Sequence, residues 1–354
     1  MNIQDILTIA VQKKAADIFI VAGQPATMKI YNQLVFVDNE RLLPHSTEQI
    51  IKDIYELAHH RDISRLEEHG DDDFSFSIPG ISRFRVSTYK QRGSLAAVIR
   101  VISFDLPKPQ DIGIPEDLIQ LADIKKGLIL VTGPAGMGKS TTQACMIDYI
   151  NTTQSKHIIT LEDPIEHLHS HKKSIVSQRE ITIDSLSYVN ALRAALRQAP
   201  DVILLGEMRD YETINIALTA AETGHTVIST LHTVGAATTI DRIIDVFPAN
   251  QQHQIALQLS MTLETVISQQ LVPTVDGKLV PVFEVMQATP AIRNMIRENK
   301  VHQIDSVIAS SAHCKMVSME NSLLELYKKG IISEETALLY SINQEVMKRK
   351  LNIK

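Results

Sequence analysis

Residues 127–144, GLILVTGPAGMGKSTTQA, constrain the fold of this chain more than any other stretch. Gly133, Gly138, Lys139 and Ser140 fit the pattern G-x-x-x-x-G-K-[ST], with an apolar strand before it and helix-compatible sequence after it. The glycines let backbone N–H groups close around phosphate oxygens, and the start of the helix presents further unpaired N–H groups to an anion. Lys139 would supply positive charge to the β- and γ-phosphates of a nucleotide, and the Ser140 hydroxyl a ligand for Mg²⁺. The segment therefore predicts a phosphate-binding loop (P-loop) rather than an ordinary turn, formed by Gly133, Pro134, Ala135, Gly136, Met137, Gly138, Lys139, Ser140 and Thr141.

The sequence from the P-loop onward alternates short apolar runs with helix-compatible segments. The runs lie at 128–132, 158–161, 202–205 and 227–231. Nearly continuous apolar strands that alternate with helices are typical of a largely parallel sheet covered on both faces. From about Thr289 onward the pattern is helical and increasingly charged. We therefore expect an α/β domain over residues 116–354 with a helical C-terminal region.

The first 103 residues show a different pattern, which predicts a separate α+β domain. Apolar residues at helical spacing predict a helix at the N-terminus, at Ile3, Ile6, Leu7, Ala10 and Val11. Ser46 is placed to cap a second helix that runs to about His59. Alternating segments predict strands at 18–23, 28–37, 73–78, 83–89 and 95–102. The predicted linker between the two domains is 104–115, with Pro107, Pro109 and Pro115.

Composition argues against several other classes of protein. The net charge is −6, tryptophan is absent and aromatic residues make up 5% of the chain, which disfavours nucleic-acid binding. Cys145 and Cys314 are far apart and lack CxxC spacing, so neither a disulfide framework nor a zinc site is expected. No apolar run approaches the roughly 18 residues of a membrane span, and the N-terminus lacks the pattern of a secretory signal. These features predict a cytoplasmic protein that does not insert into a membrane.

Acidic residues follow two of the predicted strands. Glu207 comes soon after the run 202–205, where a carboxylate could orient or deprotonate an attacking water; Gly206 stands where many P-loop enzymes have an acid. Glu162 and Asp163 follow the run 158–161, and ligands of open α/β sheets bind at the carboxyl ends of the strands. Carboxylates there could hold Mg²⁺ or its waters. The alternatives are a solvated acid at a strand end and a plain acidic loop.

Two histidines and two arginines are weaker candidates. His232 closes the strand 227–231 at its carboxyl end, where it could sense a γ-phosphate through a hydrogen bond. His225 lies seven residues earlier, and an odd offset on a strand puts the two side chains on opposite faces, so they are not expected to share a metal. Arg85 and Arg100 lie on strands of the N-terminal domain. P-loop enzymes that assemble in rings often complete the site with an arginine from elsewhere, but each of these alone is better explained as a surface or interface arginine.

Four segments occur in a fixed order along the chain: GPAGMGKSTT, TLEDPIEH, LRQAPDVILLGEMRD and AAETGHTVISTLHT. This set resembles the secretion ATPase family of type II secretion and type IV pili, where the segments are called the Walker A motif, Asp box, Walker B motif and His box. The resemblance covers essentially the whole chain. Within the family it is similar to the pilus retraction ATPases of twitching motility, PilT and PilU. The chain starts almost directly with the small N-terminal domain, lacks the paired CxxC zinc motif of assembly ATPases, and contains AIRNMIRE at 291–298, which closely matches a motif associated with retraction.

The resemblance implies a PAS-like N-terminal domain and a RecA-like ATPase domain, assembled as a homohexamer that binds ATP and Mg²⁺. It implies that the ring works in the cytoplasm at the inner-membrane base of the pilus machine, on the pilus platform protein, where it drives retraction for twitching motility and DNA uptake. The residues that it assigns to catalysis are Glu207, Glu162, Asp163, His225, His232, Arg85 and Arg100.

The chain departs from the family pattern at two positions of the P-loop. Ala135 and Met137 replace the more usual Thr and Ser, which leaves the predicted phosphate ligands in place and puts the rate of hydrolysis in question. Some segments are closer to PilT and others to PilU, so the paralogue stays open. The alternatives are an accessory ATPase that modulates a paralogous retraction motor, a pilus assembly or secretion ATPase, and a DNA-processing hexamer.

Overall fold

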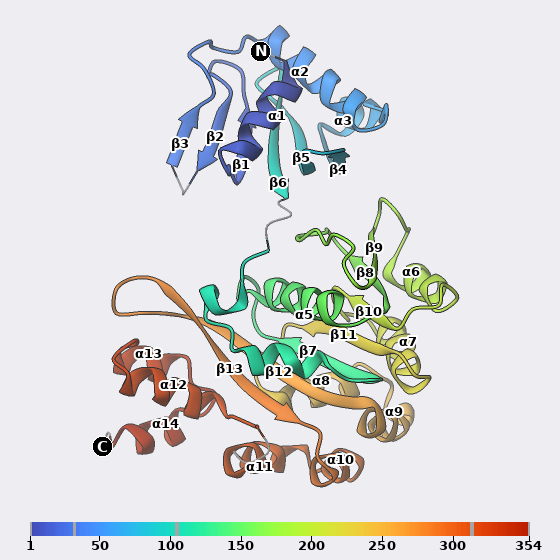
Figure 1. Ribbon diagram of the computed structural model, residues 1–354, viewed down its shortest axis with the longest axis vertical. Coiled ribbons are helices and arrows are strands. Elements are labelled where there is room, and N and C mark those ends of the chain that lie inside the picture. The colour runs from blue at the N-terminus through green and yellow to red at the C-terminus, as the bar shows by residue number, and fades with distance from the viewer. Residues whose placement is uncertain (1, 31–32, 103–105, 312–314, 353–354) are drawn as a thin grey trace. The chain divides into compact units, whose positions relative to one another are not determined.

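The computed structural model describes residues 2–30, 33–102, 106–311 and 315–352 (Figure 1). Contacts divide the chain into two compact units, the first from Met1 to Asp105 with Glu166–Leu168, the second from Leu106 onward. Residues 106–115, predicted as linker, belong to the second unit, because Ile114 is buried there among apolar side chains. Within the described part of the chain, no helix is long and apolar enough to cross a membrane.

The first unit is one antiparallel sheet of six strands in the order β3-β2-β1-β6-β5-β4. The strands are β1 (Asp17–Ile20), β2 (Thr27–Ile30), β3 (Gln33–Phe36), β4 (Asp71–Ile78), β5 (Ser82–Gln91) and β6 (Ser94–Ile102). The helices are α1 (Ile3–Gln12), α2 (Pro44–Leu57) and α3 (Ser64–His69). The single strand predicted over 28–37 is wrong, because β2 and β3 are separate, antiparallel strands; residues 31–32 lie outside the described residues. Ser46 does not cap α2, which begins earlier, with Pro44 in its first turn.

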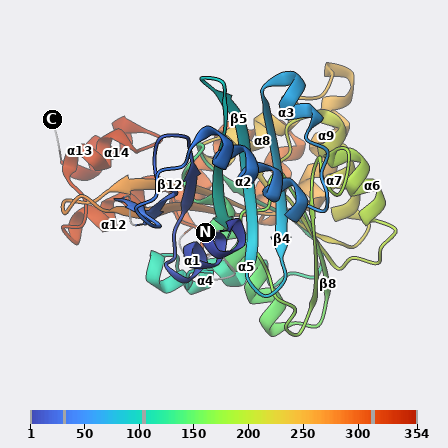
Figure 2. The same cartoon turned by 90° about the horizontal axis from the view of Figure 1, so that it is seen from above.

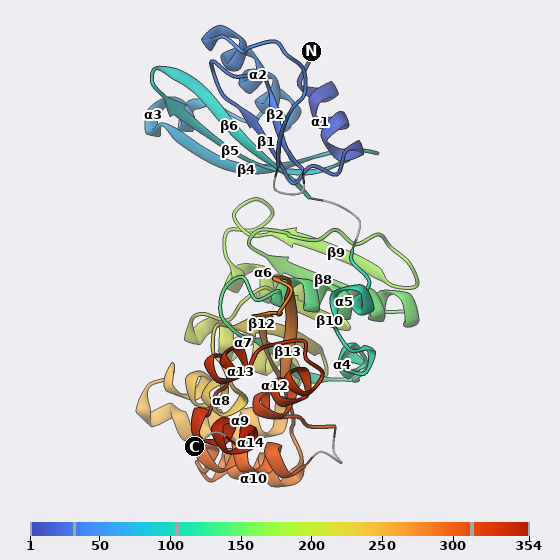
Figure 3. The ribbon, with the colours of Figure 1, turned by 90° about the vertical axis from the view of Figure 1, so that its left-hand side faces the viewer.

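Alternation along the strands separates the two faces of this sheet. Phe84, Val86 and Ile99 are buried with apolar residues of α1 and α2, which cover one face (Figure 3). Arg85 and Arg100 point to the other face, where both side chains are exposed. They lie directly opposite each other on β5 and β6, and Asp17 follows Arg100 in the same row on β1. The Arg100 Nε atom lies 2.9 Å from the Asp17 carboxylate, which offsets the repulsion between the two arginines.

The second unit is built on a sheet of seven strands in the order β13-β12-β7-β11-β10-β8-β9. Six strands are parallel and the edge strand β13 is antiparallel, which confirms the largely parallel sheet predicted from the apolar runs. The strands are β7 (Gly127–Thr132), β8 (His157–Glu162), β9 (Ile175–Glu180), β10 (Val202–Leu205), β11 (Thr226–Leu231), β12 (Leu263–Pro273) and β13 (Leu279–Gln287). Strands β9, β12 and β13 were not predicted from the sequence.

Helices cover both faces of this sheet, and neighbouring residues of β7 show why. Leu128 and Leu130 pack toward one layer of helices, whereas Ile129 and Val131 pack toward the other. The first layer is α6 (Tyr188–Ala195), α7 (Tyr211–Glu222), α8 (Ala236–Asp245), α9 (Ala249–Thr262), α10 (Pro290–Arg297) and α11 (Ile304–Ser310). The second contains α4 (Glu116–Ile119) and α5 (Lys139–Thr153). The short 3₁₀ segments are Pro109–Ile112, Gln120–Ala122 and Val301–Gln303.

The predicted helical C-terminal region is confirmed from α10 onward. Thr289 caps α10 by accepting the Ile292 N–H, and Ile292 and Ile296 bury one face of the AIRNMIRE segment. Three further helices form a small cluster of their own, visible together in Figure 2: α12 (Met319–Lys328), α13 (Glu334–Leu339) and α14 (Gln344–Leu351). They pack on the ends of β12 and β13, at Val272 and Val282.

Candidate nucleotide-binding site

The P-loop residues form the turn between β7 and α5. Gly133, Gly136 and Gly138 have φ values of +139°, +76° and +78°, which side chains with a Cβ rarely adopt. Gly138 is the N-cap residue of α5 and makes no side-chain capping hydrogen bond. The first N–H groups of α5 are thus left for an anion, and the helix dipole favours negative charge there. The turn therefore leaves backbone N–H groups at the start of α5 where an anion could bind.

Lys139 lies across the mouth of this loop. Its Nζ atom donates to the Gly133 and Pro134 carbonyl oxygens, at 2.9 Å each, and lies 3.4 Å from His232 Nδ1. The residue is 8% exposed, so its ammonium group is held by polar atoms of the loop rather than by bulk water. An ammonium group can only donate, so the contact favours the histidine tautomer with its proton on Nε2.

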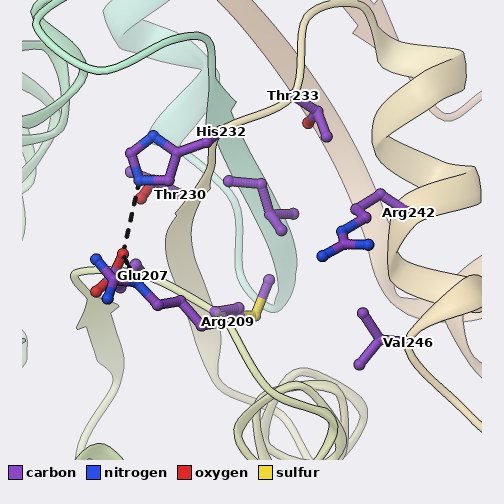
Figure 4. A pocket seen from close by; sticks show the side chains of 9 residues that line it. Glu207, Arg209, Thr230, His232, Thr233, Arg242 and Val246 are labelled. Atoms are coloured by element: carbon purple, nitrogen blue, oxygen red, sulfur yellow. Dashed lines mark ion pairs between the residues drawn. The ribbon is translucent and has the colours of Figure 1, made fainter.

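Glu207 and His232 meet at the carboxyl ends of two neighbouring strands, β10 and β11. The His232 Nε2 atom lies 3.6 Å from the Glu207 carboxylate, and Arg209 Nε lies 2.6 Å from the same oxygen. These side chains line a pocket of about 450 Å³, into which Arg242 of α8 points from the other side (Figure 4). Lys139, His232 and Glu207 therefore form one line of contacts. It runs from the P-loop at the end of β7, past the end of β11, to a carboxylate beyond the end of β10.

The predicted acid Glu162 is the last residue of strand β8, which is paired with β10, and Asp163 follows it directly. Thr160 Oγ1 donates to a Glu162 carboxylate oxygen over 2.6 Å, and Gln178 Nε2 donates to the same oxygen over 3.3 Å. The peptide bond between Asp163 and Pro164 is cis. Glu166, the third acid of this segment, is exposed.

Tyr188 lies close enough to Glu207 and to these acids to feel their charges, and no signal in the sequence pointed to it. Burial raises the pKa of the Tyr188 hydroxyl, and the negative charges of Glu207, Asp163 and Glu162 raise it further. The same hydroxyl explains Gly206. A Cβ at that position would lie 2.8 Å from Tyr188 Oη and 3.3 Å from the Leu161 carbonyl oxygen, so an acid cannot stand there without displacing its neighbours.

Of the remaining candidates in the second unit, His225 does not lie at this place. His225 lies at the amino end of β11, about 20 Å of strand away from His232, with its Nδ1 atom 3.0 Å from the Ala220 carbonyl oxygen. Arg85 and Arg100 belong to the first unit. Arg209 and Arg242 were missed; Arg209 stands two residues after Glu207, a position that alone carries no catalytic signal.

A magnesium ion at this site would be bound mainly through phosphate oxygens, with Ser140 and Glu162 as the candidate protein ligands. Among the residues that the structure describes, no group of three or more His, Cys, Asp or Glu side chains could hold a metal ion. Ser140 is the second residue of α5, beside the N–H groups that face an anion, and Glu162 supplies a carboxylate at a strand end. One hydroxyl and one carboxylate suit Mg²⁺, which keeps several waters and binds largely through the phosphates of its substrate.

Glu284 connects the loop after His232 to the C-terminal helices. Its carboxylate accepts the Ala236 N–H at the start of α8 over 2.8 Å and the Met319 N–H at the start of α12 over 3.4 Å. Burial raises the pKa of this carboxyl group to about 7, against an ordinary value of 4.5, and the nearby carboxyl groups of Asp305 and Glu320 also raise it. A proton is therefore bound more tightly in the folded state than in the unfolded state.

The raised pKa of Glu284 predicts a stability that depends on pH. Because the folded pKa exceeds the unfolded one, this group favours the folded state fully below about pH 4.5 and progressively less up to about pH 7. Relative to Glu284→Gln, which cannot titrate, the wild type should lose free energy of unfolding between pH 5 and pH 7.5, by about 1.4 kcal/mol per pKa unit at most. Urea denaturation at both pH values measures the difference. A constant difference between wild type and Glu284→Gln would contradict the raised pKa.

Known proteins are similar to this chain over nearly its whole length. The family model described as type II/IV secretion system protein matches residues 1–350. The chain is 44% identical to the type IV pilus retraction ATPase PilT of Pseudomonas aeruginosa, over 95% of this chain and 97% of that protein. It is 39% identical to the type IV pilus ATPase PilU of the same organism, over 96% of this chain and 89% of that one. A crystal structure of the pilus retraction motor PilT with bound ADP is similar in fold, with a TM-score of 0.89, 46% identity and 99% of both chains covered.

Proposed function

The chain belongs to the family of type II/IV secretion system proteins, and on that premise we propose that it is a motor ATPase that powers the retraction of type IV pili. The observation that carries the proposal is the line of contacts from Lys139 through His232 to Glu207, which joins a phosphate-binding loop to a carboxylate able to activate water. The similarity to PilT over nearly all of both chains supports the choice of a retraction motor within the family.

Each residue of the site has a part in ATP hydrolysis on this proposal. The loop N–H groups and Lys139 bind and orient the β- and γ-phosphates, and Ser140 and Glu162 would hold Mg²⁺, which neutralises charge on the phosphates. Glu207 accepts a proton from the attacking water as the bond from the γ-phosphorus to the bridging oxygen breaks, giving ADP and phosphate. Arg209, whose side chain is 75% exposed, gives up its pairing with Glu207 at little cost.

A second pocket adjoins the other end of the P-loop and is the place that we propose for the nucleoside. It has a volume of about 620 Å³ and is bordered by Gly138 and Thr141 at the start of α5, by Leu271 of β12, and by Ile112 and Ile114. Its size lies in the usual range for small-molecule sites, and apolar side chains beside a phosphate-binding loop suit a base and a ribose.

The assembly and partners of the proposed motor rest on the family resemblance. We propose a homohexamer in the cytoplasm, docked on the inner-membrane platform protein of the pilus machine. Arg85 and Arg100 would contribute positive charge to the nucleotide from the first unit, and their exposure on the face of the sheet left uncovered by α1 and α2 supports this role. A paralogous retraction ATPase is a further proposed partner.

Deletion of the gene tests the direction of the motor. Cells without the protein should keep or gain surface pili, because extension is intact, and should lose twitching motility. Electron microscopy counts the pili and stab assays measure twitching, and a plasmid copy of the wild-type gene should restore both. Cells without any pili would indicate an assembly ATPase instead.

An accessory ATPase is the second candidate, and the identity to PilU over 96% of the chain favours keeping it. That function predicts surface pili that still retract in the deletion strain, only more weakly. Purified protein would then bind ATP with little turnover until the partner motor is added.

A further inference from the structure

Strand β12 continues past the end of its neighbour β7, and the P-loop lies against the residues of β12 beyond that end. The last residues paired between the two strands are Ser268 and Thr132. Beyond them, a Cβ added to Gly133 would lie 2.1 Å from the Gln269 carbonyl oxygen, closer than any real contact. The first glycine of the P-loop is thus required by the edge of β12 as well as by its own backbone conformation.

The Gln269 side chain joins the loop to the helix that follows it. Its Nε2 atom donates to the Met137 carbonyl oxygen over 2.7 Å, and its Oε1 atom accepts the Thr142 hydroxyl over 2.6 Å. Gln269 is 2% exposed and Thr142 is fully buried, so water does not compete for these bonds. Both polar ends of one side chain are therefore used to set the position of the loop relative to α5.

Met137 makes a third contact between the P-loop segment and β12. Its sulfur accepts the Leu271 N–H over 3.2 Å, at an edge of β12 that no longer faces β7. A thioether is a weak acceptor, but it shields a backbone donor that would otherwise need water. The residue that departs from the usual family pattern has a defined partner on β12.

We propose that Gln269, Thr142 and Met137 form a strand-edge clamp that holds the P-loop in its phosphate-binding shape. They are positioning residues, since they act through the loop N–H groups. A loop that is already ordered loses little conformational entropy on binding, so the clamp raises the affinity for the β-phosphate. The inference rests on the proposed function only in taking the ligand to be a nucleotide.

Gln269→Ala tests the clamp through the affinities for ADP and AMP, measured by calorimetry on the full chain. AMP lacks the β-phosphate that the loop grips, so the variant should bind ADP about tenfold more weakly and AMP within about twofold of the wild type. The ratio of the two affinities is a readout that general destabilisation would not change. The matched control is Gln270→Ala, which removes the neighbouring buried glutamine; that side chain bonds the Tyr340 carbonyl oxygen instead, and the ratio should stay unchanged.

Three further variants, at two positions, keep the test informative if Gln269→Ala does not fold. Thr142→Val removes the hydroxyl at nearly constant volume and should lower the ratio of the affinity for ADP to the affinity for AMP. Thr142→Ser keeps the hydroxyl and should have the wild-type ratio. Met137→Leu keeps the bulk without the sulfur and should weaken ADP binding by about twofold to threefold. An unchanged ratio in both Gln269→Ala and Thr142→Val would overturn the clamp while the wild type still binds ADP. A wild type that binds no ADP would overturn the proposed function as well; turnover is not part of this test.

Discussion

Replacing Lys139 with alanine is expected to reduce ATP hydrolysis at least about a hundredfold. The ammonium group is the one side-chain cation inside the described P-loop turn, and it bridges the Gly133 and Pro134 carbonyl oxygens. Without it the γ-phosphate loses its charge partner, and the loop loses two hydrogen bonds that bring its ends together. Phosphate release at saturating ATP and Mg²⁺ measures the effect.

The matched control for this change is Lys126→Ala. Lys126 is an exposed lysine immediately before the same strand, β7, so its replacement removes an equal charge without touching the loop. Its turnover should stay within about twofold of the wild type. Thermal unfolding of both variants shows whether each chain is folded. Near-normal hydrolysis by folded Lys139→Ala would mean that the phosphates bind elsewhere.

Glu207→Gln should separate hydrolysis from binding. Glutamine keeps the size of the side chain but cannot take a proton from water, so the turnover number should fall by about a thousandfold. The affinity for ATP should stay within a few-fold, because Glu207 lies on the far side of His232 from Lys139. Single-turnover phosphate release and equilibrium binding of ATP measure the two quantities separately.

Glu212→Gln is the control for the lost ion pair. Glu212 pairs with Arg193 over 2.6 Å, the same separation as Glu207 and Arg209, but on the exposed surface of α7. If the loss in Glu207→Gln came from the missing ion pair, Glu212→Gln should show a similar loss, and we expect none. Full hydrolysis by Glu207→Gln would point to Glu162 or Asp163 as the group that activates water.

The parts of the site that could be predicted from the sequence are those that depend on local or simple topological rules. The P-loop is set by consecutive residues, and apolar runs identify β7, β8, β10 and β11. The carboxyl ends of parallel strands share one edge of a sheet, which is why Glu207 and His232 lie within 3.6 Å although they are 25 residues apart. The same rule predicts that His225, at the other end of its strand, lies far from them.

The parts that could not be predicted depend on contacts between distant segments. Gln269 contacts Met137 across 132 positions of sequence, and a pair of glutamines in a buried strand reads as a polar segment. Strand β12 was missed because its buried polar residues, these glutamines among them, interrupt the apolar pattern that identifies a central strand. Tyr188 was missed because its proximity to Gly206 and to the acids exists only once β8, β10 and α6 are packed together.

The order of strands in the larger sheet has a consequence for synthesis of the chain. Strand β7 and the P-loop leave the ribosome more than a hundred residues before β12, the strand against which the loop is seated. Until residue 271 has emerged, the nascent P-loop has neither the Gln269 amide nor the Leu271 N–H to hold it. Pairing across such a sequence separation is slow, so the loop is completed late. Cellular ATP therefore has little stabilising effect on the growing chain and acts as a folding ligand only once the protein is nearly whole.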